Sequence, residues 1–145
     1  MPDTNVIFAG DLVEYGATPY CGDAHFTDWP ATLDALASFA PAAMVPGRGA
    51  ALTNRAMVAD GIKGTRAFLS DLFEAVRDHV AAGRSLRETF ERVHEALKPA
   101  YGDWVIFEHC LPFNVTRAYD EAGGLDHPRI WTDERDRQMW LDLRG

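Results

Sequence analysis

Two short apolar runs near the amino terminus constrain the fold of this chain more than any other feature. The first covers residues 6–9 and leads into Gly10-Asp11, and the second covers residues 42–45 and leads into the Pro-Gly-Arg-Gly stretch at 46–49. Consecutive apolar residues with β-branched and aromatic members are typical of a strand that is buried on both faces. Each run therefore predicts a buried strand followed by a turn that presents one charged side chain.

A helical pattern joins the two runs. It opens at Asp28-Trp29-Pro30 and places apolar residues four, three and four positions apart, at Trp29, Leu33, Leu36 and Ala40. The three segments together predict a strand, helix, strand crossover with parallel strands. Because ligand sites in α/β folds lie outside the carboxyl ends of such strands, we expect Asp11 and Arg48 to lie near each other at that rim.

Length and charge narrow the class of protein. The chain has 145 residues, a formal net charge of -8, and 14 Lys and Arg residues that form no basic run. Such a chain suits one domain and disfavours binding to nucleic acid or to an anionic membrane, since phosphate binding needs clustered cations. No apolar stretch reaches the roughly 20 residues of a membrane span, and no signal-peptide pattern is present. The sequence predicts a cytoplasmic protein.

The two cysteines offer little chemistry. Cys21 and Cys110 form no Cys-x-x-Cys motif, so neither a zinc knuckle nor a redox motif is indicated. Reduced thiols are expected in a cytosolic chain, and a single disulfide is the alternative. His109 precedes Cys110, but neighbours in sequence usually point apart, which favours packing over a nucleophile and base pair.

The rest of the chain is predicted to be mostly helical. A long amphipathic pattern runs from residue 53 or 54 to about 82 and is followed by Gly83. Ser85 and Glu88 form a capping box for a second helix, which Pro99 is expected to end, so that the two helices make an antiparallel hairpin.

Further helices are expected towards the carboxyl terminus. The run 104–107 is predicted to lie in the core, either as a strand or as a buried helix, because periodicity cannot decide between them. A short helix is predicted over residues 114–122, and a last helix is predicted to start after Thr132. Arg117 and Tyr119 on the short helix are candidates for the same rim as Asp11, but the sequence does not determine their direction.

The segments at 8–13 and 45–49, with the Trp29-Pro30 helix between them, resemble the carboxyl-terminal half of metallo-β-lactamase-fold hydrolases. In that family a strand that ends in Gly-Asp provides an aspartate that bridges two metals, and a Pro-Gly-His-Gly turn provides a histidine ligand. The resemblance implies a partial αββα unit over residues 1–52 and a helical accessory region over residues 53–145. It also implies Asp11 as a metal ligand, with zinc or another divalent ion assisting hydrolysis of a small-molecule substrate.

Two departures from the family pattern shape this expectation. The His-x-His-x-Asp-His motif is absent, and Arg48 stands where the turn should offer a histidine. A protonated guanidinium cannot bind a metal, so only Asp11 transfers to a ligand position. We therefore expect the carboxyl-terminal part of a metal-dependent hydrolase that is inactive alone. Its metal would be held only if another segment or chain, such as a missing amino-terminal half, supplied the other ligands.

Two side chains are candidates for substrate binding, and the sequence assigns no catalytic residue. Arg48 could hold a substrate carboxylate or phosphate, or it could instead form a salt bridge with Asp11 that joins the two strand ends. His25 is the histidine best placed to approach Asp11, and a purely structural role is its alternative. The aromatic residues of the same loop either bind a ligand or cover the helix that follows.

A second class of function remains open from the sequence. The chain could be a noncatalytic binding or oligomerisation module in which the helical hairpin of residues 54–98 pairs with a second copy. Exposed strand edges and broad apolar stripes in a short chain favour self-association under either hypothesis, so we expect a homodimer or a larger assembly.

Overall fold

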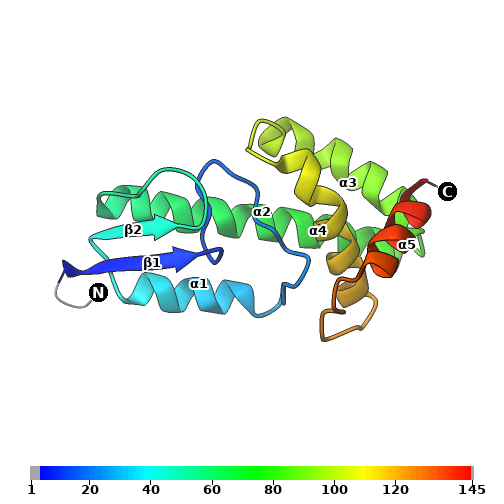
Figure 1. Ribbon diagram of the computed structural model, residues 1–145, viewed down its shortest axis with the longest axis horizontal. Coiled ribbons are helices and arrows are strands. Elements are labelled where there is room, and N and C mark those ends of the chain that lie inside the picture. Colours follow the sequence, from blue (N-terminus) through cyan, green and yellow to red (C-terminus); the bar gives the residue numbers. More distant parts are fainter. Residues whose placement is uncertain (1–3, 145) are drawn as a thin grey trace.

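The computed structural model describes residues 4–144 and consists of a small parallel sheet followed by helices (Figure 1). In chain order the elements are β1 (Val6–Gly10), α1 (Trp29–Ser38), β2 (Ala43–Pro46), α2 (Arg55–Ala81), α3 (Leu86–Tyr101), α4 (Phe107–Ala122) and α5 (Asp133–Arg144). The sheet and α1 lie at one end of the molecule, α3, α4 and α5 lie at the other, and α2 runs between the two ends. The predicted α/β start with a mostly helical remainder is confirmed.

The predicted crossover is present. Strands β1 and β2 are parallel, with Ile7 opposite Met44 and Phe8 opposite Val45, and the register shifts between Phe8 and Gly10. On its far side β2 makes an isolated antiparallel bridge in which Met44 and Leu52 exchange two backbone hydrogen bonds of 2.8 Å. The carboxyl ends of both strands therefore meet at one rim, where Asp11 and Arg48 follow.

The sheet is covered on one face only, so the prediction of strands buried on both faces is wrong. Ile7, Ala9 and Met44 face the core that the helices complete. Phe8 and Val45, which are register partners, remain 66% and 36% exposed on the other face. The reason is the period of two along a strand, which turns alternate residues away from the helices.

The long helix and the capping box are confirmed. The Asn54 side chain accepts a hydrogen bond from the backbone N–H of Met57, and the Ser85 and Glu88 side chains satisfy each other's backbone donors at the start of α3. The predicted end at Pro99 is wrong, because α3 continues to Tyr101. The Tyr101 hydroxyl donates a hydrogen bond to the Asp71 carboxylate on α2, a tertiary contact that holds the last turn in place.

The start of α4 also differs from expectation. Residues 104–106 form neither a strand nor a helix, and Ile106, with a φ of 59°, acts as the N-cap residue. Helix α4 begins at Phe107, the last residue of the run, rather than at residue 114. Phe107 is buried as predicted, whereas Val105 is 62% exposed because its backbone, and not its side chain, pairs with the loop at Gly16–Thr18. A helix start without a side-chain cap has no sequence signature.

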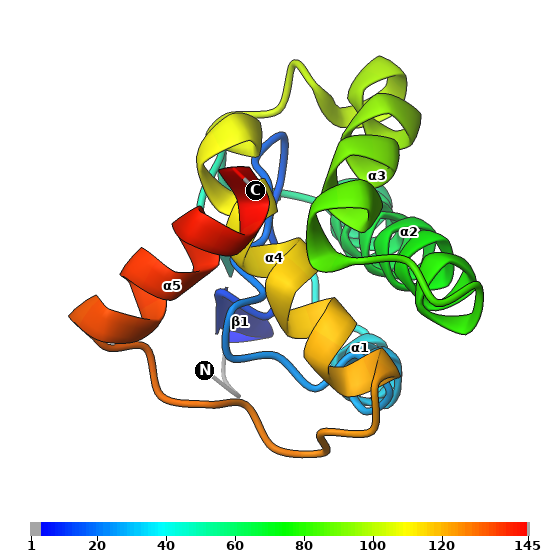
Figure 2. The same ribbon diagram turned by 90° about the vertical axis from the view of Figure 1, so that its right-hand side faces the viewer.

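The last helix follows its predicted cap. The Thr132 hydroxyl accepts a hydrogen bond of 3.2 Å from the backbone N–H of Arg135, as an N-cap does. Figure 2 shows this end of the molecule, where α3, α4 and α5 come together. Over residues 4–144, none of the helices combines the length and the apolar character needed to cross a membrane.

Candidate functional site

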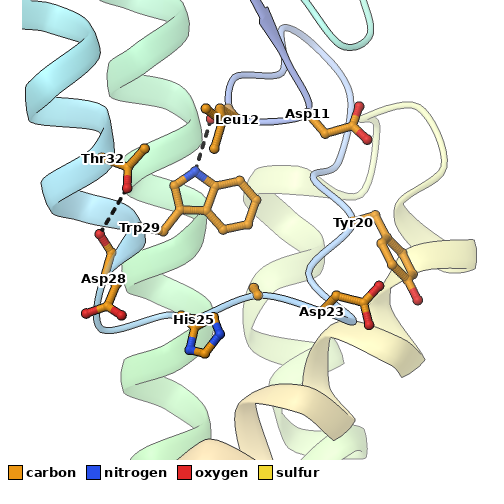
Figure 3. A pocket seen from close by; sticks show the side chains of 9 residues that line it. Asp11, Leu12, Tyr20, Asp23, His25, Asp28, Trp29 and Thr32 are labelled. Carbon is orange, nitrogen blue, oxygen red and sulfur yellow. Dashed lines mark hydrogen bonds between the residues drawn. The ribbon is translucent and has the colours of Figure 1, made fainter. Parts of the chain in front are cut away.

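A pocket of about 490 Å³ opens beside the carboxyl end of β1 (Figure 3). Its walls come from the turn after β1, from the loop that leads to α1, and from the first turn of α1. The lining residues are Asp11, Leu12, Tyr20, Asp23, Ala24, His25, Asp28, Trp29 and Thr32. The pocket therefore lies where the crossover predicts a ligand site, and it carries acidic and aromatic side chains.

The turns after β1 and β2 pack directly on each other at the rim of this pocket. The backbone N–H of Gly47 donates to the Val13 carbonyl at 3.0 Å, and a Cβ at Gly47 would collide with the Asp11 carboxylate. Arg48 Nη1 lies 3.7 Å from Asp11 Oδ1. The expected proximity of Asp11 and Arg48 is confirmed, in the form of an ion pair.

The closer partner of Arg48 is a residue that the sequence did not indicate. Arg48 Nη1 donates a hydrogen bond of 2.7 Å to Glu14 Oε1, and the Glu14 side chain has 0% exposed surface. Burial raises the pKa of the Glu14 carboxyl, and the Arg48 guanidinium acts in the opposite direction. An acidic residue between apolar Val13 and aromatic Tyr15, in a chain with a matching arginine at the neighbouring turn, was the only available signal.

The other oxygen of the Glu14 carboxylate lacks such a contact among the described residues. Glu14 Oε2 is buried and has no hydrogen-bond partner among residues 4–144. Two acids and one cation therefore meet at this point, because Asp11 also acts on Glu14 and raises the pKa of its carboxyl. A buried carboxylate of this kind depends on its one cation, Arg48.

His25 is expected from the sequence to be the histidine best placed to approach Asp11; both line the pocket, and Figure 3 shows the two side chains on opposite sides of it. The His25 ring packs edge-on against His127, with 5.8 Å between ring centroids. Between the two sides, the indole N–H of Trp29 donates to the Leu12 carbonyl at 3.1 Å and ties α1 to the turn after β1.

Polar side chains of α4 form hydrogen bonds with the backbone of the loop between β1 and α1, which we call the pocket loop. Asn114 accepts a hydrogen bond of 2.7 Å from the backbone N–H of Cys21, and its amide donates to the Pro19 carbonyl at 2.8 Å. Arg117 donates to the Ala24 carbonyl at 2.7 Å. Arg117 is fully buried and does not reach the rim, so one of the two candidates on this helix serves the loop and not the pocket opening.

A carboxylate of the same helix binds the backbone shortly before α1. The Glu121 carboxylate accepts hydrogen bonds of 3.0 Å from the backbone N–H groups of Phe26 and Thr27, and it pairs with Arg117 at 2.7 Å. Tyr119, the other candidate on α4, donates instead to the Arg84 carbonyl at 2.8 Å. No spacing in the sequence relates these α4 residues to a loop so far away in the chain.

The cysteines do not form a reactive pair with a histidine. Cys21 and Cys110 are free and buried, and burial raises the pKa of both thiols. His109 is exposed and packs near Phe113, whereas the neighbouring Cys110 points into the protein. This arrangement agrees with the packing interpretation of the His109-Cys110 pair.

The described residues do not fit a resident metal by themselves. Within residues 4–144 no group of three or more His, Cys, Asp or Glu side chains is placed to hold a metal ion. Asp11 is the only expected ligand at the rim, and the nearest cationic group, Arg48, would repel a second cation there. No catalytic step can therefore be derived through a metal from this chain alone.

Comparison with protein-family models gives no match for this chain, and comparison with curated proteins gives no significant match.

Proposed function

We propose that this chain is the carboxyl-terminal part of a metallo-β-lactamase-like, metal-dependent hydrolase. In this proposal Asp11 contributes one ligand to a composite site, and the pocket with His25 binds part of the substrate. The observation that carries the proposal is the direct packing of the Gly10-Asp11 turn on the Pro46-Gly47-Arg48 turn, at the carboxyl ends of two parallel strands joined by one helix.

The same proposal includes inactivity of the chain alone. A hydrolytic metal site needs about three or four protein ligands, and residues 4–144 offer no such group. The missing ligands would come from another segment or another chain, and the metal would then activate a water molecule for attack on a carbonyl group. Without them, Asp11 is left in an ion pair with Arg48.

The open face of the sheet supports a composite arrangement. Phe8 and Val45 present adjacent apolar side chains on a sheet face that no helix of the described chain covers. A parallel sheet normally has both faces covered. A second layer supplied from elsewhere would bury these side chains and lie next to the rim that holds Asp11.

The rival hypothesis of a noncatalytic module loses its expected contact surface. The apolar stripe of α2 is already buried within the chain, where it packs in the core with residues of α3 and α4; its buried members include Val58, Ile62, Leu69, Leu72 and Val76. If the chain acts as a module, the open sheet face, rather than the helical hairpin, offers an apolar surface for a partner.

Replacing Arg48 by histidine in the turn after β2 tests whether residue 48 corresponds to the histidine ligand of the metallo-β-lactamase fold. Isothermal titration with Zn²⁺ would compare the natural chain with Arg48→His. The change removes the guanidinium and adds an imidazole beside Asp11, so zinc affinity is expected to rise by about tenfold or more and to fall again in Arg48→His/Asp11→Ala.

The matched control is Arg66→His. Arg66 also pairs with an aspartate, Asp34, but this pair joins α2 to α1, and neither residue lines the pocket. An equal gain of zinc affinity in Arg66→His, or no gain in Arg48→His, would remove the basis for placing Asp11 and residue 48 in ligand positions.

A further inference from the structure

The rim holds two acids and one cation, so the three charges do not cancel. Asp11 and Glu14 are two acids that interact with each other, and Arg48 is the cation that acts on Glu14. The Glu14 side chain is completely buried, yet its Oε2 atom has no hydrogen-bond partner among the described residues. Buried carboxylate oxygens are normally paired, so the unpartnered oxygen marks a place suited to a cation.

We propose that the Arg48 guanidinium, held by Glu14, occupies the place that a metal cation would take beside Asp11, and that this rim is therefore metal-free in the chain as it stands. Arg48 Nη1 contacts both acids, at 2.7 Å for Glu14 Oε1 and at 3.7 Å for Asp11 Oδ1. The comparison with a metal rests on the proposed function, whereas the three-charge cluster does not.

Sterics and charge make the two cations mutually exclusive at this rim, so the composite metal site of the proposed function would form only after Arg48 had moved away from Asp11. A divalent metal bound to Asp11 would lie about 2.0 to 2.2 Å from a carboxylate oxygen. That position is next to the guanidinium, so the two cations would overlap and repel each other, although water around the 70% exposed Asp11 side chain weakens the repulsion. Glu14 keeps the guanidinium in place, because releasing Arg48 would leave a buried carboxylate without a cation.

Glu14 gains a defined role from this inference. It is the positioning residue for Arg48, since it anchors one nitrogen of the guanidinium from inside the protein while Arg48 remains 39% exposed. Loss of the arginine would leave Asp11 and Glu14 as a pair of carboxylates open to a divalent cation, which is a ligand set that hard cations prefer.

The experiment measures Mn²⁺ binding by the natural chain and by Arg48→Gln. Electron paramagnetic resonance detects the Mn²⁺ that stays free in solution. The glutamine is neutral and retains an amide that can donate to Glu14. The natural chain is expected to bind no Mn²⁺ at the rim. Arg48→Gln is expected to bind at least about tenfold more tightly, and the gain is expected to vanish in Arg48→Gln/Glu14→Gln.

Three comparisons decide the result. Arg48→Lys keeps a cation and is expected to bind no more Mn²⁺ than the natural chain, and Arg66→Gln controls for a change of net charge alone. Tight Mn²⁺ binding by the natural chain that Asp11→Ala abolishes would overturn the inference, and so would an Arg48→Gln chain that gains no affinity. If Arg48→Gln does not fold without metal, restoration of the fold by Mn²⁺ supports the inference and failure of Mn²⁺ to restore it contradicts the inference.

The outcome is separate from that of the zinc experiment. A gain of Mn²⁺ binding that requires Glu14, together with no gain of zinc binding in Arg48→His, would retain the three-charge cluster and reject the family correspondence. The reverse pattern would retain the correspondence and reject Arg48 as the substitute cation.

Discussion

Arg48 Nη1 donates a 2.7 Å hydrogen bond to Glu14 Oε1, and the Glu14 side chain that holds this arginine at the pocket rim has no solvent-exposed surface. We expect Arg48→Met to destabilise the protein by about 3 kcal/mol, the lower end for breaking a buried pair, because Arg48 itself touches solvent. Urea unfolding would measure the loss. Arg48→Met/Glu14→Gln should recover part of it, and Arg66→Met, which breaks the exposed pair with Asp34, should cost about 1 kcal/mol or less. Equal losses in Arg48→Met and Arg66→Met would contradict the buried pair.

Gly47 is the second point at which the rim can be tested. A Cβ there would collide with the Asp11 carboxylate and would lie 2.9 Å from the Asp11 backbone nitrogen. Gly47→Ala should therefore separate the two turns and destabilise the protein by about 1 to 3 kcal/mol. Gly64→Ala is the matched control, because its Cβ meets only Trp104, at 3.9 Å, in the interior of α2. Thermal unfolding should show stabilisation of Gly64→Ala by about 0.5 to 1 kcal/mol.

Arg117 should matter to the pocket although it lies outside it. Arg117→Met leaves the Glu121 carboxylate without its partner and the Ala24 carbonyl without its donor, so we expect a loss of about 3 to 5 kcal/mol. Hydrogen exchange should quicken first at the backbone N–H groups of Phe26 and Thr27, which Glu121 binds. An increase spread evenly over the whole chain would argue against a specific hold on the loop.

The capping box at the start of α3 predicts an acid-side loss of stability. Hydrogen bonds from the Ser85 backbone N–H and hydroxyl lower the pKa of the Glu88 carboxyl. A lowered pKa means that the unfolded state binds the proton more readily, so the contribution is present above the ordinary glutamate value near 4.5 and is lost as pH falls through the lowered value. Glu88→Gln should remove this part of the pH dependence below about pH 5, as measured by unfolding at a series of pH values.

The same cap can be tested at neutral pH. Ser85→Ala removes the acceptor for the Glu88 backbone N–H and should cost about 1 kcal/mol at pH 7. Ser38→Ala is a suitable control, since Ser38 lies at the carboxyl end of α1, where its hydroxyl donates to the Ala35 carbonyl and caps no helix start. Similar losses at both positions would contradict a specific role for the cap.

The open sheet face predicts self-association. Light scattering after size-exclusion chromatography should detect a dimer or a larger species for the natural chain, and Phe8→Ser should shift it towards the monomer because it removes apolar area from the exposed face. Ile130→Ser controls for apolarity alone, since Ile130 is exposed in the segment between α4 and α5, which lies at the end of the molecule opposite the sheet (Figure 1). A natural chain that stays monomeric at all concentrations would contradict this prediction.

The parts of the fold that depend on local patterns were predictable from the sequence. The crossover follows from two apolar runs and a helical stripe, and the starts of α2 and α3 follow from Asn54 and Ser85, which are good N-cap residues. The proximity of Asp11 and Arg48 follows from the parallel arrangement of the strands. The apolar run of β1 led to the wrong prediction that the strand is buried on both faces. A strand can be apolar on a face that the rest of its own chain does not cover.

The parts that depend on distant contacts were not predictable. Burial of Glu14 depends on the turn after β2, and no local pattern distinguishes it from a surface acid. The start of α4 at Phe107 depends on backbone pairing of Val105 with the loop near Gly16, in place of a side-chain cap. For the candidate site, the sequence predicted the rim with Asp11 and Arg48. It did not indicate that Glu14 holds Arg48, or that α4 binds the loop between β1 and α1.

The ties between the pocket loop and α4 have a consequence for the order of folding. Asn114 and Arg117 bind atoms of residues that precede them by 93 to 95 positions in the chain. Contacts that close such long loops form late, whereas helices such as α2 and α3 can gain local contacts early. During synthesis the pocket cannot close until α4 has left the ribosome, so a ribosome stalled before that point would carry a nascent chain with helices and an open, undefined loop.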